Sequence, residues 1–266
     1  MAGKTGVYND NARKYHVNEN YFKNIDTSEK AYWLGFIQAD GCLYMQKTSI
    51  RFQINLSARD MLHLEKLNRA IDSTYKVYEK KVTVKGREYD SCSLQITSKP
   101  FAANLMKNGI EIRKSLNDAF PSLSSNLMPH YIRGFMDGDG SIKVAKQKPG
   151  KDYVQVSVRF AGGKEFLIKL RDYLKKELNC SFAEKSIRRM GKSKAYEFSF
   201  SKQKDVINFY EHVYKDATVF LERKFLRYTK GLSSLYVPYK SNLISELSEF
   251  IESPNEKDEG NNEPSL

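Results

Sequence analysis

The stretch YWLGFIQADG at residues 32–41 decides the fold, because it recurs as YIRGFMDGDG at residues 131–140. The two copies lie 99 residues apart, and their Tyr, Gly, Phe, Asp and final Gly fall in register. In a chain of 266 residues, this repeat predicts two halves of about 100 residues each that are built on one plan.

The segments after each copy predict the same order of elements. Hydrophobic patterns in the first half indicate strands at 49–56, 75–84 and 90–97 and helices at 61–71 and 100–107. In the second half they indicate strands at 153–160, 180–187 and 194–201 and helices at 165–178 and 204–214. With one more strand between each motif helix and the first of these strands, the predicted fold class is α+β, with two pseudo-symmetric αββαββα halves that each form a four-stranded antiparallel sheet with helices on one face.

The rest of the chain is divided by composition. We expect an N-terminal arm at 1–26, the first half at 27–120, the second half at 121–232, a C-terminal helix at 233–252 and an acidic, disordered tail at 253–266. Asp26 and Thr27 precede the first motif and are typical helix-capping residues.

The chain is strongly basic, with 44 lysines and arginines against 32 acidic residues and a formal charge of +12. The tail after residue 252 is itself acidic, so the rest of the chain is more basic still. An excess of this size indicates a polyanionic partner, of which nucleic acid is the usual one.

Other classes are excluded by what the sequence lacks. No run approaches the ~20 apolar residues that a membrane span needs, and residues 1–5 lack the apolar stretch of a signal peptide. The three cysteines are scattered and predict neither a disulfide framework nor a zinc site. We therefore expect a cytoplasmic protein of a bacterial or phage-infected cell, with no membrane partner.

Each motif places small residues four positions apart, Gly35 with Ala39 and Gly134 with Gly138. Positions i and i+4 share one helix face, so small residues there allow a second helix to approach at backbone distance. The simplest partner is the other motif, and the two motif helices should pack side by side as the seam between the halves. The glycine after each aspartate is expected to stop its helix in the left-handed conformation.

Each motif helix also ends in an aspartate, Asp40 or Asp139. A helix C-terminus carries about −0.5 charge, so a carboxylate there is unfavourable unless a cation neutralises it. Carboxylates together with the helix-end carbonyls of Ala39 and Gly138 suit a hard divalent ion such as Mg²⁺. A single Asp-Gly pair would merely indicate a turn, but two copies within a ten-residue match favour a shared metal site.

The segments WLGFIQADG and IRGFMDGDG, at 33–41 and 132–140, resemble the two motifs of a single-chain LAGLIDADG homing endonuclease. The resemblance implies a monomeric, site-specific double-strand DNA endonuclease in which Asp40 and Asp139 bind catalytic Mg²⁺ or Mn²⁺. There are two departures. Gln38 stands where the family often has an Asp, matched by Asp137 in the second copy, which predicts an asymmetric centre. Arg133 is unusually polar for its position and is expected to face outward.

The resemblance also implies basic residues near the end of each half that activate water and balance phosphate charge, here Lys114 and Lys224. The two sheets would form a saddle on the DNA major groove, with polar side chains at alternate strand positions contacting the bases. The candidates are Arg51, Gln53, Asn55, Lys81, Arg87, Gln95, Lys143, Gln155, Arg159, Arg188 and Arg189. Because the halves differ, the target should be a long site that is an imperfect palindrome or asymmetric, as for an enzyme of intron homing.

Two alternatives on the same scaffold stay open. One is a maturase that binds intron RNA, and the other is a DNA-binding regulator that does not cut. Retention of both motif aspartates favours cleavage.

Overall fold

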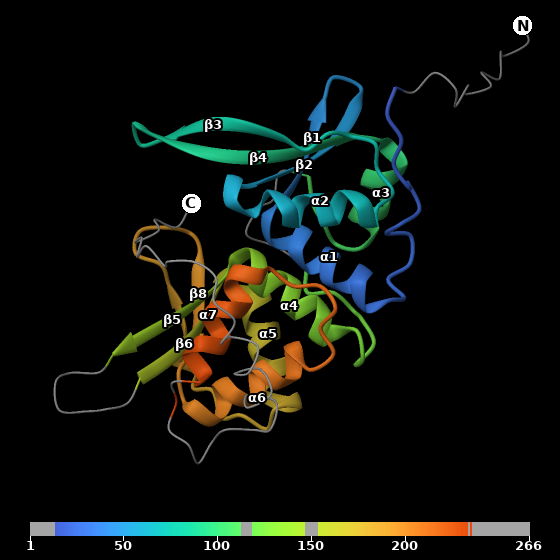
Figure 1. Ribbon diagram of the computed structural model, residues 1–266. Coiled ribbons are helices and arrows are strands. Elements are labelled where there is room, and N and C mark those ends of the chain that lie inside the picture. Colours follow the sequence, from blue (N-terminus) through green and yellow to red (C-terminus); the bar gives the residue numbers. More distant parts are fainter. Residues whose placement is uncertain (1–13, 113–118, 147–153, 234, 236–266) are drawn as a thin grey trace, which may run out of the picture.

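The structure is a computed structural model that describes residues 14–112, 119–146, 154–233 and 235 (Figure 1). It contains two four-stranded antiparallel sheets, with strand orders β1-β2-β4-β3 and β5-β6-β8-β7. The same order in both sheets confirms the predicted α+β fold of two pseudo-symmetric halves. In Figure 1, α1 and α4 lie side by side at the centre, between the strands of the first half and those of the second.

The first half follows the predicted order of elements closely. Its members are α1 (Ser28–Asp40), β1 (Gly41–Gln46), β2 (Ser49–Ser57), the 3₁₀ turn η2 (Ala58–Asp60), α2 (Met61–Ala70), β3 (Tyr78–Val84), β4 (Arg87–Thr97) and α3 (Lys99–Lys107). Thr27 caps α1, because its hydroxyl accepts a hydrogen bond from the Lys30 backbone N–H at 3.2 Å. Residues 85 and 86 form the expected turn between β3 and β4, both with positive φ.

The second half repeats this order and adds one helix. Its members are α4 (Met128–Asp139), β5 (Gly140–Lys146), β6 (Val154–Gly162), α5 (Lys164–Glu177), η3 (Glu184–Ser186), β7 (Ile187–Arg189), β8 (Tyr196–Phe200), α6 (Gln203–Tyr214) and α7 (Glu222–Ser233). The strand predicted at 180–187 is wrong, because β7 begins only at Ile187 and the residues before it include the turn η3. Cys180 and Phe182 are buried against the core from a segment outside the sheet, and this produced the alternating pattern.

Helix α7 was not predicted, although its apolar residues lie on one face. Tyr228 and Leu232 are fully buried, and the α-carbon of Gly231 faces Val144 and Val156 on the second sheet. The C-terminal helix and the acidic tail predicted after residue 233 lie outside the described residues.

The described part of the expected N-terminal arm packs on the first half. Val17, Tyr21 and Phe22 are buried, and the amide of Asn108 in the turn after α3 donates to the Phe22 carbonyl at 2.7 Å.

None of the helices in the described ranges is both long enough and apolar enough to cross a membrane.

Candidate active site at the helix seam

Glycines bring α1 and α4 into backbone contact. A Cβ atom on Gly35 would overlap the Tyr131 carbonyl oxygen, and one on Gly134 would overlap the Tyr32 carbonyl oxygen. The reciprocal pair is what a pseudo-two-fold axis through the seam requires. One turn later, a Cβ on Gly138 would overlap the Cβ of Ala39. The predicted seam of four small residues is therefore present.

The two helices end together, although not as predicted. Gly41 and Gly140 have extended backbones, with φ of −77° and −86°, so the expected left-handed stop is wrong. In both halves the backbone instead passes directly from the motif helix into the first strand of the sheet. Glycine is needed there for space, because a Cβ would overlap the carbonyl of Ile37 or of Met136 in the last turn.

Asp40 and Asp139 directly follow the Ala39–Gly138 contact and therefore lie at the same end of the seam. Asp40 is half-buried, Asp139 is exposed, and an Asp40 carboxylate oxygen lies 3.0 Å from the position a Gly138 Cβ would take. Within the described ranges, no group of three or more His, Cys, Asp or Glu side chains is arranged so that it could hold a metal ion. A cation here would rely on these two carboxylates and on helix-end carbonyls.

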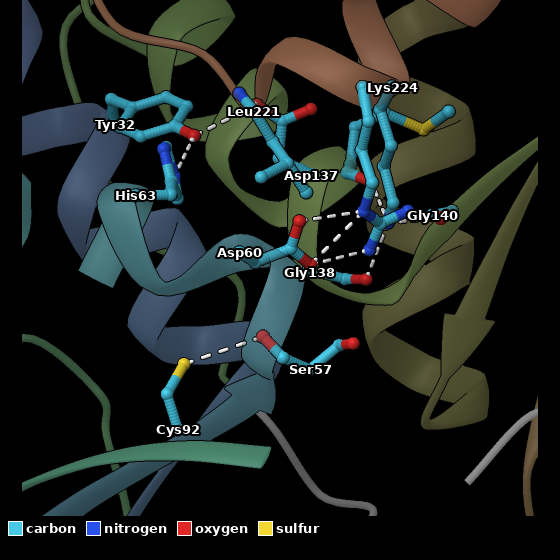
Figure 2. A network of polar contacts seen from close by, with 12 residues as sticks. Tyr32, Ser57, Asp60, His63, Cys92, Asp137, Gly138, Gly140, Leu221 and Lys224 are labelled. Atoms are coloured by element: carbon cyan, nitrogen blue, oxygen red, sulfur yellow. Dashed lines mark hydrogen bonds and ion pairs between the residues drawn. The ribbon is translucent and has the colours of Figure 1, made fainter. Parts of the chain in front are cut away.

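Lys224 lies at the end of α4, as Figure 2 shows. Its ammonium donates to the carbonyls of Gly138 at 2.8 Å, Gly140 at 2.7 Å and Met136 at 3.3 Å. Burial lowers the pKa of Lys224 to about 8, although the nearby carboxylates, Asp137 first, favour its charged form. The predicted basic residue of the second half is thus beside Asp139. Its predicted partner Lys114 lies outside the described residues.

Asp137 is 1% exposed and points into the protein rather than toward the helix ends. It accepts hydrogen bonds from the Leu221 backbone N–H at 2.7 Å, the Tyr32 hydroxyl at 2.8 Å and the Tyr214 hydroxyl at 3.3 Å. Burial raises the pKa of Asp137 to about 6, against these hydrogen bonds, which favour the carboxylate. The expected difference between Asp137 and Gln38 is present, but both side chains are buried in the protein rather than placed at the helix ends with Asp40 and Asp139.

Arg133 is fully buried, so the expectation that it faces outward is wrong. Its guanidinium donates to the carbonyls of Val213 at 2.6 Å and Val219 at 2.9 Å, and it lies 5.3 Å from the centre of the Tyr32 ring. These carbonyls near the end of α6 and before α7 replace the water that the charge would otherwise need.

An ion pair between the halves was missed by sequence reasoning. Arg223 on α7 donates two hydrogen bonds at 2.8 Å to the buried carboxylate of Asp60, which belongs to η2 of the first half. Burial and the neighbouring charge of Arg223 also lower the pKa of Arg59. Arg59 lies in η2 next to Asp60 and was also missed. It follows closely on the end of β2, near the first motif, and a basic residue at such a place is the signal that could have drawn attention to it.

The helix-free face of the first sheet carries cations and no carboxylate. The strand register places Arg51, Lys80 and Arg87 on this face, whereas Glu79, Glu88 and Asp90 have the opposite parity. The polar side chains there are joined to one another. Arg51 donates to the Gln95 amide oxygen at 3.1 Å, and the Asn55 amide oxygen accepts from Gln53, Lys80 and Ser93.

The corresponding face of the second sheet carries cations and one acid. The register places Lys143, Gln155, Arg159 and Arg188 on it. Glu197 lies between two of them and pairs with Arg188 at 2.8 Å and Arg159 at 3.6 Å. This face is therefore less basic than its counterpart.

Two of the predicted DNA-contacting residues have the wrong parity for these faces. Lys81 lies opposite Asp90 on the other side of β3 and pairs with Glu88 at 3.5 Å, while its neighbour Lys80 takes the helix-free face. Arg189 lies opposite Tyr196, and its guanidinium donates to the Ser193 carbonyl at 2.7 Å. Successive residues of a strand point to opposite sides of the sheet, so only every second residue of a basic run can face the DNA, and the predicted number of DNA-contacting residues was too high.

Comparison with known proteins gives a consistent fold. No protein-family profile and no curated protein sequence matches this chain. Among solved structures, it is similar to a lysine mutant of I-SmaMI (TM-score 0.56, 16% identity, 84% of this chain and 96% of that one). It is also similar to the I-LtrWI LAGLIDADG homing endonuclease bound to target DNA (TM-score 0.56, 15% identity, 89% and 98%). I-SmaMI bound to uncleaveable DNA matches with a TM-score of 0.54 at 15% identity over 82% and 95%.

The resemblance of the two motifs therefore extends to the whole architecture, and this chain has the fold of the single-chain LAGLIDADG homing endonucleases.

Proposed function

We propose that this protein is a site-specific double-strand DNA endonuclease that hydrolyses one phosphodiester bond on each strand of a long, asymmetric target with the help of Mg²⁺ or Mn²⁺. The observation that carries the proposal is the pair Asp40 and Asp139 at the end of a glycine-packed seam, flanked by two cationic sheet faces. Two carboxylates at the negative ends of adjacent helices suit a divalent cation in addition to the Lys224 ammonium at the end of α4, and a cationic sheet face suits a polyanion.

The similar structures support the same reading. I-SmaMI is described in complex with cleaved DNA and, separately, with an uncleaved DNA target in the presence of calcium ions. I-LtrWI is described bound to its target DNA. Since these likenesses are below 25% identity, the activity of this chain rests on its own residues.

In the proposed site, Asp40 and Asp139 would hold the divalent ions, which stabilise the charge that develops on the phosphate and the departing oxygen. The Ala39 carbonyl oxygen would be the backbone ligand of the metal on the α1 side. The Gly138 carbonyl fits less well than the sequence suggested, because the Lys224 ammonium donates to it. We assign Lys224 to balancing phosphate charge at the second-half side, and Lys114 to the same role in the first half.

The DNA would lie across both helix-free faces, with Arg51, Gln53, Asn55, Arg87 and Gln95 on the first and Lys143, Gln155, Arg159 and Arg188 on the second. The hydrogen bonds among the first-sheet side chains hold them in place before DNA arrives, which reduces the ordering cost of binding. We expect the protein to act as a monomer, since one chain contains both halves of the seam.

The test is incubation with a randomised duplex library, with and without Mg²⁺, followed by sequencing of the new ends. Cuts at one site that depend on Mg²⁺ are expected. The matched control carries Asp40→Asn and Asp139→Asn together and should retain DNA without cutting it. Specific retention by the unaltered protein with no cuts would instead identify a non-cleaving regulator, and preference for structured RNA would favour a maturase.

A further inference from the structure

The first turn of α7 is attached to three other parts of the molecule. The Leu221 N–H donates to Asp137 on α4, Arg223 pairs with Asp60 of the first half, and Lys224 donates to the carbonyls of Gly138 and Gly140. Lys224 follows Leu221 by less than one helical turn, so whatever fixes the Leu221 backbone also fixes the base of the lysine side chain.

Asp137 is the centre of this attachment. It is buried and accepts hydrogen bonds from α1 through Tyr32, from α6 through Tyr214 and from the start of α7 through Leu221 (Figure 2). Tyr32 belongs to the other half, and its hydroxyl is also joined to His63 at 2.8 Å. Loss of this acceptor would leave buried donors without a partner, which destabilises the arrangement around the start of α7.

Among the described residues, the first half shows no counterpart of this arrangement. Gln38 takes the position that corresponds to Asp137, is also buried, and its amide nitrogen has no hydrogen-bond partner among the described residues. A neutral amide offers one acceptor oxygen, whereas Asp137 uses both of its oxygens. At this position, therefore, only the second half has a carboxylate that accepts hydrogen bonds from three donors and so connects its neighbouring elements.

We propose that Asp137 is a positioning residue that holds Lys224 on the end of α4 and thereby governs cutting of one DNA strand, the strand whose scissile phosphate lies beside Lys224. The proposal rests on the nuclease function above. It does not require Asp137 to touch metal or DNA, because its oxygens face Tyr32, Tyr214 and Leu221. One lysine can lie beside only one of two phosphates on opposite strands, so the effect is strand-specific.

The first measurement follows each strand separately, with the target duplex labelled on both strands. For Asp137→Asn, cutting of one strand should slow by about tenfold or more and that of the other by less than about twofold, so that nicked DNA accumulates. The matched control is Leu174→Ala, which removes a fully buried side chain from α5 and lowers the stability of the same half while leaving the hydrogen-bonding groups of Asp137 and Lys224 unchanged. It should slow both strands equally.

The second measurement needs neither DNA nor metal. Reductive methylation of the free protein, read by mass spectrometry, should modify Lys224 several times faster in Asp137→Asn than in the unaltered protein, with exposed Lys176 as the internal reference. Tyr214→Phe removes only the 3.3 Å donor and should shift both readouts slightly in the same direction, so the test survives if Asp137→Asn does not fold.

Equal slowing of both strands, or unchanged Lys224 reactivity in a folded variant, would overturn the positioning role. If the unaltered protein cuts no DNA, the proposed function fails, and the lysine reactivity alone then decides whether Asp137 positions Lys224.

Discussion

The ends of α1 and α4 carry the same motif, yet the protein surrounds them differently. At the end of α4, Lys224 donates to three carbonyls and Asp137 binds three donors from three other elements. At the end of α1, the corresponding buried residue is the neutral Gln38. The sheets differ in the same way, since the first face has no carboxylate and the second contains Glu197 between two arginines. The two halves thus share a symmetric core but differ in the side chains that surround it.

The largest expected effect comes from the residues that the halves share. Asp40→Asn and Asp139→Asn should each reduce double-strand cleavage by about a thousandfold or more, or about 4 kcal/mol of barrier, because each removes a carboxylate from the shared centre. Affinity for DNA, measured in Ca²⁺ by gel shift, should change little. Retained double-strand cutting by either variant would exclude that aspartate from the site.

The seam should be the next most sensitive feature. Gly134→Ala should destabilise the protein by about 2–3 kcal/mol, because the new Cβ overlaps the Tyr32 carbonyl and the two backbones must separate. Denaturant unfolding measures this loss. The comparison is Gly191→Ala in the exposed β7–β8 turn, where nothing lies within 4 Å and only the strained φ of +52° costs stability. Equal losses would show that close packing at the seam is not the cause.

The histidine in the first half should make stability fall in acid. Burial lowers the pKa of His63 to about 3, so the unfolded chain binds its proton first as the pH falls through 6.5. Its contribution is complete above pH 6.5 and declines toward pH 3, by at most about 1.4 kcal/mol per pH unit. Asp137, with a pKa of about 6, acts in the opposite direction between about pH 4 and 6. His63→Gln should therefore flatten or reverse the acid loss seen by urea unfolding, and an unaltered profile would contradict this.

The sheet faces should give the smallest effects. Arg51→Ala should weaken DNA binding several-fold and reduce the slope of log affinity against log salt by about one, as expected for one lost phosphate contact. Arg159→Ala should do less, because Arg159 already shares its charge with Glu197. Lys81→Ala serves as the control, since Lys81 lies on the opposite side of its strand. A loss with Lys81→Ala equal to that with Arg51→Ala would show that the strand parity does not define the DNA face.

The sequence pattern predicted those features of the structure that depend on neighbouring residues in the chain. The motif glycines predicted the seam, strand alternation predicted which face of β2 is polar, and the element order predicted both sheets. The same reasoning failed at 180–187, where two buried side chains alternate outside a sheet, and at α7, whose partners lie on β5 and β6.

The sequence by itself therefore determined the duplicated fold, the packed helix seam and the two aspartates at its end, because each depends on residues within one motif. Only the tertiary structure decided what surrounds those aspartates. Arg133 is buried because carbonyls about 80 positions away replace its water, and Asp60 meets Arg223 across a separation of 163 residues. Burial of a charge is permitted only where distant groups compensate it, and no local pattern contains those groups.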